Sequence, residues 1–221
     1  AYGKTLYAAI ADSSGNLETV LKLESETKTV TELSPNIKLA YDEYGLTDWR
    51  RDCFAWDAEN EKLIFANGST LNMLHEDKRL LFTVKTEGVA SSASFSPDKE
   101  SVLVLTENRQ LIRYAADDST MLDSIMLTEY TPESPMGIND SCKWIFTDEN
   151  ELLLCADNIG YLIDIADSRL KIRAVIDNCI GCSYYRDSII IVESNSDACS
   201  IGSFRRQSAE ALVEAANMTI K

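Results

Sequence analysis

Few side chains in this 221-residue chain have the types and spacing that catalysis requires. The single histidine, His75, lies in the charged segment 74–78, where we expect a solvated hairpin turn rather than a general base or a metal ligand. A Ser-His-Asp triad would have to use His75, and no G-x-S-x-G sequence supplies its nucleophile. The chain also has no phosphate-binding glycine-rich loop and no H-E-x-x-H sequence. The sequence therefore predicts a protein that is not an enzyme and has no cofactor.

The six cysteines include one C-x-x-C pair, Cys179 and Cys182. A zinc site would need a second pair or nearby histidines, so we favour two structural thiols over a metal or redox centre. Cys155 lies inside an apolar run and is expected to be a small core residue. Reduced thiols fit a cytoplasmic protein. The cysteines thus predict no metal site.

A sequence repeat predicts the strands and turns on which these side chains lie. Trp56, Phe95, Phe146 and Tyr185 follow one another at intervals of 39, 51 and 39 residues, close to the length of one propeller blade. A polar turn follows each aromatic, and then an apolar run typical of a strand buried on both faces. The turns are 57–60, 96–99, 147–150 and the shorter 186–187, and the apolar runs are 63–66, 102–105, 152–155 and 188–192.

A second turn, a third strand and a more polar fourth strand complete each unit. The second turns are expected at 67–68, 107–109, 158–160 and 195–197, and Asn67-Gly68 is the strongest hairpin signal among them. Segments 111–114 and 161–164 are third strands, and 80–84 and 171–175 are fourth strands with one face in water.

The N-terminal residues form another unit that lacks its first strand. Segments 4–11, 17–23 and 29–33 supply its second, third and fourth strands, with a turn at 13–16. Either the chain is a piece of a longer protein, or residues 216–220 complete this blade. Segment 208–217 has a helix-favouring Ala and Glu content, but its place in the repeat predicts a strand.

The phrase Ala93-Ser94-Phe95-Ser96-Pro97-Asp98-Lys99, with its strand, turn and strand sequel, resembles the WD40-like β-propeller superfamily. The resemblance runs weakly over most of the chain. The Trp-Asp and Gly-His dipeptides of that family are missing, since Tyr114-Ala115 and Ile165-Ala166 stand where Trp-Asp would be. The buried polar network of a typical WD40 blade is therefore not expected. The resemblance implies an interaction platform and nothing finer about function.

We therefore predict an all-β fold, a WD40-like β-propeller of about five four-stranded blades. This prediction includes an incomplete ring and a fragment of a larger propeller. An antiparallel sandwich or an irregular β-solenoid is the alternative fold. The prediction is one domain, 1–221, excised from a larger protein, with blades at 1–35, 48–88, 89–130, 139–178 and 180–221. Either five blades close the ring, or a partner covers the exposed sheet faces.

Composition limits the partners. The net charge of −15 disfavours nucleic acid and anionic lipid, and no segment has the length and character of a spanning helix or a targeting signal. We interpret the charge as a soluble bacterial, cytoplasmic surface rather than a dedicated site for a basic partner. The sequence does not indicate the oligomeric state or the partner.

Two long connectors between blades, 36–52 and 128–141, carry the candidate binding residues. In propellers of this kind these connectors lie on one common face, and aromatic and Arg side chains dominate interface hot spots. Packing of Trp49 and Tyr44 onto blade edges is an equally good interpretation. The candidates are Tyr41, Tyr44, Trp49, Arg50, Arg51, Tyr130 and Met136.

The function that these observations favour is a non-enzymatic interaction or sensor module that binds a protein or peptide, or other domains of its parent protein, through the connector face. The alternative is a propeller enzyme of the hydrolase or lactonase kind, or a metal- or glycan-binding propeller. That alternative would use acidic residues at the channel mouth, such as Asp57, Asp98, Asp148 and Asp187. We expect most of these four carboxylates to stabilise turns by hydrogen bonds to the nearby backbone.

Overall fold

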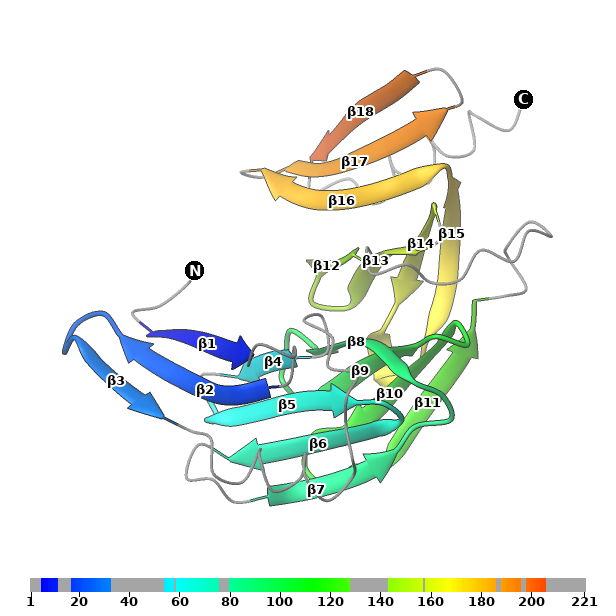
Figure 1. Cartoon of the computed structure of the whole chain (residues 1–221). Helices are drawn as coiled ribbons and strands as arrows, with labels where there is room; N and C mark the ends of the chain where they lie inside the picture. The colour runs from blue at the N-terminus through cyan, green and yellow to red at the C-terminus, as the bar shows by residue number, and fades with distance from the viewer. Residues whose placement is uncertain are drawn as a thin grey trace. The chain divides into compact units, whose positions relative to one another are not determined.

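The computed structural model describes residues 5–11, 17–32, 54–57, 59–75, 80–127, 143–156, 158–185, 188–195 and 198–205. These residues form antiparallel β-strands and one short 3-10 helix, so the fold is all-β (Figure 1). By contacts the chain divides into two compact units, residues 1–95 and 96–221, and the boundary lies just after strand β8. The predicted turn 13–16, the tail 208–220 and Asp187 lie outside the described residues.

The strands form five sheets in chain order, three of four strands and two of three. The first unit begins with β1 (Thr5–Ala11), β2 (Leu17–Glu24) and β3 (Thr29–Glu32), and continues with β4 (Phe54–Asp57), β5 (Lys62–Asn67), β6 (Thr70–His75) and β7 (Leu80–Lys85). Strand β8 (Ala90–Phe95) is the first of the third sheet, with β9 (Ser101–Thr106), β10 (Gln110–Ala115) and β11 (Met121–Met126).

The fourth and fifth sheets lie in the second unit. The fourth contains β12 (Lys143–Asp148), β13 (Glu151–Ala156), β14 (Ile159–Asp164) and β15 (Lys171–Asp177), and the 3-10 helix η3 (Ala166–Ser168) precedes β15. The fifth contains β16 (Cys179–Tyr185), β17 (Ser188–Asn195) and β18 (Ala198–Arg205). Within each sheet every strand pairs with the next along the chain, which is the meander expected of a propeller blade.

The burial of each strand matches its apolar or polar character in the sequence repeat. Every residue of β9 and of β13 is buried, because these second strands have sheet neighbours on both sides and packed layers above and below. In the outer strand β15, by contrast, Lys171, Arg173 and Asp177 are exposed. The predicted apolar second strands and polar fourth strand are thus confirmed for this part of the chain, and the all-β propeller-like fold is confirmed with them.

Side chains of neighbouring sheets interdigitate in the second unit. One cluster joins Leu103, Leu105 and Leu111 of the third sheet to Leu154 and Tyr161 of the fourth. A second cluster joins the opposite face of the fourth sheet to the fifth. Adjacent residues of β13 serve the two clusters alternately, as the two-residue period of a strand requires. The sheets therefore bury their cores by stacking on one another, as the repeat predicts.

Two local predictions were wrong. His75 is not in a turn: it is the last residue of β6, pairs with Lys62, and places Nε2 3.9 Å from Oε2 of Glu61. The turn expected at 158–160 is shorter, because Ile159 already pairs with Ala156 and β14 begins there. Only Asn158 of those three residues has the left-handed conformation, with φ of 64°.

Candidate functional site

The residues that the sequence singled out for partner binding cannot be placed. Tyr41, Tyr44, Trp49, Arg50, Arg51, Tyr130 and Met136 all lie outside the described residues, so their role stays a prediction. The described part of the chain offers a different surface, on the third and fourth sheets of the second unit.

A pocket of about 620 Å³ lies where the start of β11 meets the loop that precedes β15. Leu122 and Leu170 are its larger apolar side chains, and Asp167, Arg169 and Lys171 contribute exposed charges of both signs. The remaining lining residues are Asp123, Asp164 and Ala166. Such a combination of apolar and mixed charged side chains suits recognition of a polypeptide surface.

Asp123 fixes the first wall of the pocket. Its Oδ2 accepts a hydrogen bond from the backbone N–H of Leu170 at 2.8 Å, and its Oδ1 accepts one from the N–H of Ser124 at 2.9 Å. The carboxylate thereby ties β11 to a loop of the neighbouring sheet, 47 residues further along the chain. The pocket wall is held by charge-assisted hydrogen bonds rather than by apolar packing alone.

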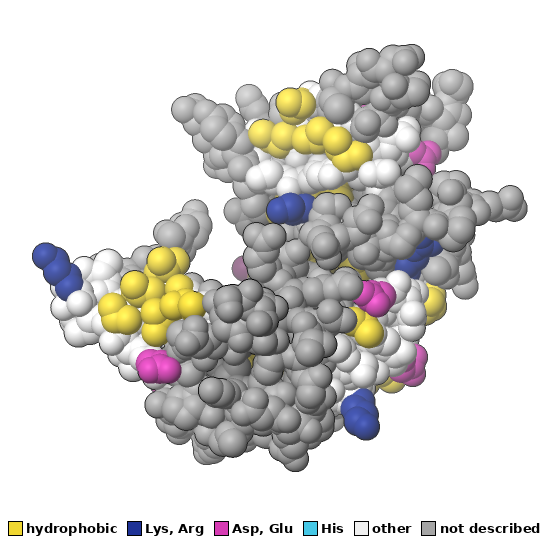
Figure 2. Space-filling view, in the orientation of Figure 1, with side chains coloured by type: hydrophobic (Ala, Val, Ile, Leu, Met, Phe, Trp, Pro, Cys, Tyr) yellow, Lys and Arg dark blue, Asp and Glu magenta, His cyan; other side chains and the backbone are white. Residues whose placement is uncertain are grey.

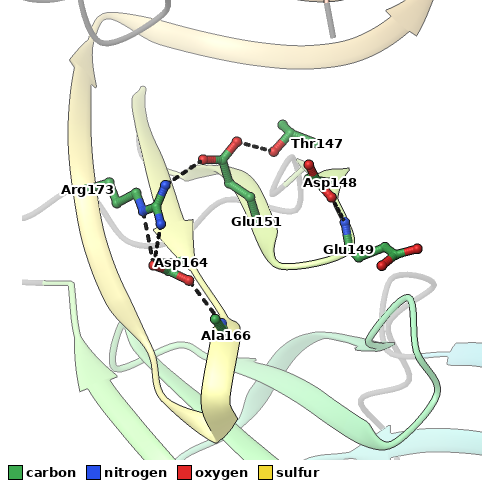
Figure 3. Close-up of polar contacts among 7 residues, drawn as sticks. All are labelled: Thr147, Asp148, Glu149, Glu151, Asp164, Ala166 and Arg173. Carbon is green, nitrogen blue, oxygen red and sulfur yellow. Dashed lines mark hydrogen bonds and ion pairs between the residues drawn. The ribbon is translucent and has the colours of Figure 1, made fainter. Parts of the chain in front are cut away.

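Asp164 fixes the opposite wall (Figure 3). It accepts hydrogen bonds from the N–H of Ala166 at 2.9 Å and from Nη2 of Arg173 at 2.6 Å. Burial favours the neutral acid, but the Ala166 N–H and the Arg173 guanidinium outweigh it and lower the pKa of Asp164. The Asp164 carboxylate in turn raises the pKa of Arg173.

The same guanidinium extends the polar network across the fourth sheet. Nη1 of Arg173 lies 3.7 Å from Oε2 of Glu151, whose other oxygen accepts a hydrogen bond from the Thr147 hydroxyl at 2.5 Å (Figure 3). Glu151 is only 5% exposed, and these two contacts give its buried side chain polar partners. Arg173 therefore connects the pocket wall to the turn between β12 and β13.

The third sheet contains a buried polar network that the sequence did not predict. Nε of Arg113 donates to Oγ of Ser101 at 2.8 Å, Oγ of Ser101 donates to Oγ of Ser96 at 2.9 Å, and Oγ of Ser96 donates to Oδ1 of Asp98 at 2.5 Å. The missing Trp-Asp and Gly-His dipeptides argued against such a network. The observed network is of a different kind, because Arg113, on the third strand, supplies the buried donor.

The described turn carboxylates are structural. Asp57 accepts hydrogen bonds from the N–H groups of Glu59 and Asn60, and Asp98 accepts one from the N–H of Glu100. Asp148 accepts one from the N–H of Glu149. Asp57 and Asp98 thus cap their own turns, as expected for side chains that bond to backbone two or three residues further on, whereas Asp148 bonds only to the next residue. Within the described residues no group of three or more His, Cys, Asp or Glu side chains could hold a metal ion.

Strand β11 differs from the outer strands β7 and β15 in what it exposes. Met121 is 55% exposed, Leu122 37% and Met126 41%, whereas the exposed residues of β15 are charged. In β7, the outer strand of the second sheet, Thr83 and Lys85 are exposed. We call Met121, Leu122 and Met126 the β11 surface. Because Met side chains adapt to many shapes and are enriched at interfaces, this surface favours contact with another polypeptide.

The pocket and the connector 128–141 adjoin opposite ends of β11 along the chain. Leu122 and Asp123 stand at the start of β11, beside the pocket, while connector 128–141 follows its end. The sequence alone did not single out the β11 surface, because the outer strand β7 has the same number of apolar residues, four of six.

A second apolar surface lies on the first sheet of the first unit. Leu6, Leu23 and Val30 stand side by side across β1, β2 and β3. Leu6 is 59% and Val30 60% exposed. Figure 2 shows hydrophobic side chains gathered over β1 and β2. Contiguous exposed apolar side chains of this kind mark contact surfaces.

Comparisons with known proteins show the fold. Neither a protein-family model nor a curated protein sequence matches the chain. A similar solved structure is that of BamB from Moraxella catarrhalis, a β-propeller, with 11% sequence identity and a TM-score of 0.56. The match covers 70% of this chain and 49% of the BamB chain, so this chain spans about half the length of that structure. The likeness shows a propeller-like fold.

No helix among the described residues is both long and apolar enough to cross a membrane.

Proposed function

We propose that this chain is a non-enzymatic protein-binding module and that the β11 surface, together with the adjacent pocket, contacts the partner. The observation that carries the proposal is the exposure of Met121, Leu122 and Met126 on an outer strand, where β7 and β15 expose polar residues. Removing these three side chains from water would favour association.

The partner that fits this surface is an extended segment of another protein. In the order of the third sheet β11 stands at one end, so its outer edge can pair with an added strand. A side chain of that segment would enter the pocket between Leu122 and Leu170, while Asp167, Arg169 and Lys171 at its border would select charges on the segment. The hydrogen bonds of Asp123 and Asp164 hold the pocket walls before binding, which lowers the entropic cost of association.

Site-specific photocrosslinking tests the location. A photoreactive amino acid is placed at position 122, and at position 83 of β7 as the matched control, because Thr83 is an exposed residue on the corresponding strand of another sheet. We expect one discrete protein adduct from position 122 and none from position 83. Equal adducts from both positions would show nonspecific contact. Further probes at positions 44 and 49 test the connectors, and adducts from these positions but not from position 122 would place binding there instead.

A further inference from the structure

Three buried cysteines meet between the fourth and fifth sheets. Cys155 is on β13, and Cys179 and Cys182 are on β16. Cys155 is 2% exposed, Cys179 0% and Cys182 8%. All three have free thiols and belong to the cluster that joins the two sheets. The C-x-x-C pair is therefore not isolated, since a third thiol from a distant segment joins it.

A β-bulge places both cysteines of the pair on the same face of β16. Residues three apart on a regular strand point to opposite faces. Here the register shifts between Cys179 and Gly181, so that Cys179 pairs with Glu193 while Cys182 pairs with Ile191. Glu193 and Ile191 are two apart and share a face of β17. The extra residue, accommodated at Ile180-Gly181, thus turns both thiols toward the fourth sheet.

The sulfur atoms of Cys155 and Cys179 lie 2.9 Å apart. A disulfide needs an S–S distance of about 2.05 Å, so an approach of roughly 0.9 Å separates the two thiols from a covalent bond. Gly160, which pairs with Cys155, makes room for this contact: a Cβ atom added there would stand 3.1 Å from Sγ of Cys179. Any larger residue at position 160 would press on the Cys179 sulfur.

The three thiols differ in their surroundings. Cys182 donates weakly to the carbonyls of Lys143 at 3.7 Å and Leu153 at 3.9 Å, which directs its sulfur to the backbone of β12 and β13. Hydrogen bonding by Cys155 lowers the pKa of Cys179, even though burial opposes the shift. Hydrogen bonding with Cys179 and Cys182, and burial, raise the pKa of Cys155. Cys179 is accordingly the better nucleophile of the contacting pair.

We propose that Cys155 and Cys179 form a redox-sensitive disulfide that joins the fourth and fifth sheets. With a hydroperoxide as oxidant, the Cys179 thiolate attacks one peroxide oxygen, the O–O bond breaks, and a sulfenic acid forms as water or alcohol leaves. The Cys155 sulfur then attacks the Cys179 sulfur, the S–S bond forms, and the sulfenic hydroxyl leaves as water with the Cys155 proton. The two thiols lose two electrons in all, and the peroxide gains them.

The disulfide would join two neighbouring sheets covalently rather than two strands of one sheet. It would close a loop between residues 24 positions apart and tether β13 to β16. A loop of that length predicts a rise in Tm of about 5–10 °C on oxidation, reversed by a thiol reductant. The proposal does not depend on the binding function proposed above.

The test is a peptide map of the native protein treated with hydrogen peroxide. The reaction is quenched, remaining thiols are alkylated in denaturant, and the digest is searched by mass spectrometry for the peptide pair joined through Cys155 and Cys179. We expect this pair, lighter by two hydrogen atoms than the two reduced peptides together, with the rise in Tm. Dithiothreitol should reverse both changes.

Matched variants assign the bond. Cys182→Ser should keep the crosslink and the rise in Tm, whereas Cys155→Ala and Cys179→Ala should lose both. A peroxide-treated wild-type protein whose Cys155 and Cys179 are recovered without a bond between them would overturn the proposal. So would a crosslink between Cys179 and Cys182 that persists in Cys155→Ala. The wild-type map decides the question even if a variant fails to fold.

Discussion

Arg113, on β10, donates a hydrogen bond from Nη1 to the backbone carbonyl of Ile165, which lies 52 residues later at the start of the η3 segment. Its Nε donates to Ser101, so one guanidinium joins the third sheet to the fourth. Arg113 is 5% exposed. Burial lowers its pKa, and the nearby carboxylates Asp98, Glu100 and Asp123 oppose that shift.

Replacing Arg113 by Met should destabilise the protein by about 2–4 kcal/mol, because the Ile165 carbonyl and the Ser101 hydroxyl would lose a charged donor. Urea denaturation measures the loss. Arg169→Ala is the control, since Arg169 is exposed, and we expect it to change stability by less than about 0.5 kcal/mol. Equal effects of the two variants would show that the buried network does not stabilise the fold.

Asp164→Asn should lower stability at pH 7 by about 1 kcal/mol, because the amide no longer pairs its charge with Arg173, which is half-exposed. The folded-state pKa of Asp164 is lowered, so its contribution is present above the unfolded value of about 3.9 and is lost as pH falls through the folded pKa. The difference between wild type and variant should therefore be constant from pH 7 to pH 5 and shrink at lower pH.

Denaturant unfolding at pH 7, 5 and 3 follows this difference. Asp177→Asn, an exposed position at the end of β15, is the control and should show no such trend. A wild-type advantage that grew on acidification would contradict the assigned Asp164–Arg173 pair.

Asp57→Ala should cost about 1–3 kcal/mol, because this buried carboxylate accepts hydrogen bonds from two backbone N–H groups and from Nδ2 of Asn60 at 2.7 Å. Thermal unfolding measures the change. Glu59→Ala in the same turn removes only an exposed side chain and should leave Tm nearly unchanged. A similar Tm for both variants would mean that the turn is not held by Asp57.

A metal scan by thermal unfolding addresses the alternative of a metal-dependent propeller. A metal ion that binds the native state must raise Tm. Because we propose a function without a metal, we expect Ca²⁺, Mg²⁺, Mn²⁺ and Zn²⁺ to leave Tm unchanged. Asp57, Asp98 and Asp148 bond to their own turns. A rise in Tm with one of these ions, absent in the presence of a chelator, would contradict a non-metal function.

The regular parts of the fold could be predicted from the sequence because they follow local rules. Short apolar runs bounded by turn residues, such as Val102-Leu103-Val104-Leu105, favour buried strands, and Asp57 and Asp98 stand where tight turns need a side-chain acceptor. The N-terminal strands predicted at 4–11, 17–23 and 29–33 match β1 (Thr5–Ala11), β2 (Leu17–Glu24) and β3 (Thr29–Glu32) closely.

The candidate site could not be predicted from the sequence, because it is built from contacts between residues far apart in the chain. Arg113 reaches Ile165, Asp123 reaches Leu170, and Cys155 meets Cys179 only once neighbouring sheets stack. The bulge at Ile180-Gly181 changes which side chains share a face, and a C-x-x-C spacing on a regular strand predicts the opposite. The candidate binding residues of the connectors, from Tyr41 to Met136, stay predictions.

The central claim is that the β11 surface binds a protein partner, and the affinity of Met121→Ser/Leu122→Ser tests it most directly. The partner identified by crosslinking at position 122 is titrated against the wild type, this variant and a Lys85→Ala control on β7. Both substituted side chains are exposed, so the variant should unfold like the wild type and bind at least about tenfold more weakly, since tenfold corresponds to about 1.4 kcal/mol. Unchanged affinity in a folded variant, or an equal loss in the β7 control, would contradict the claim.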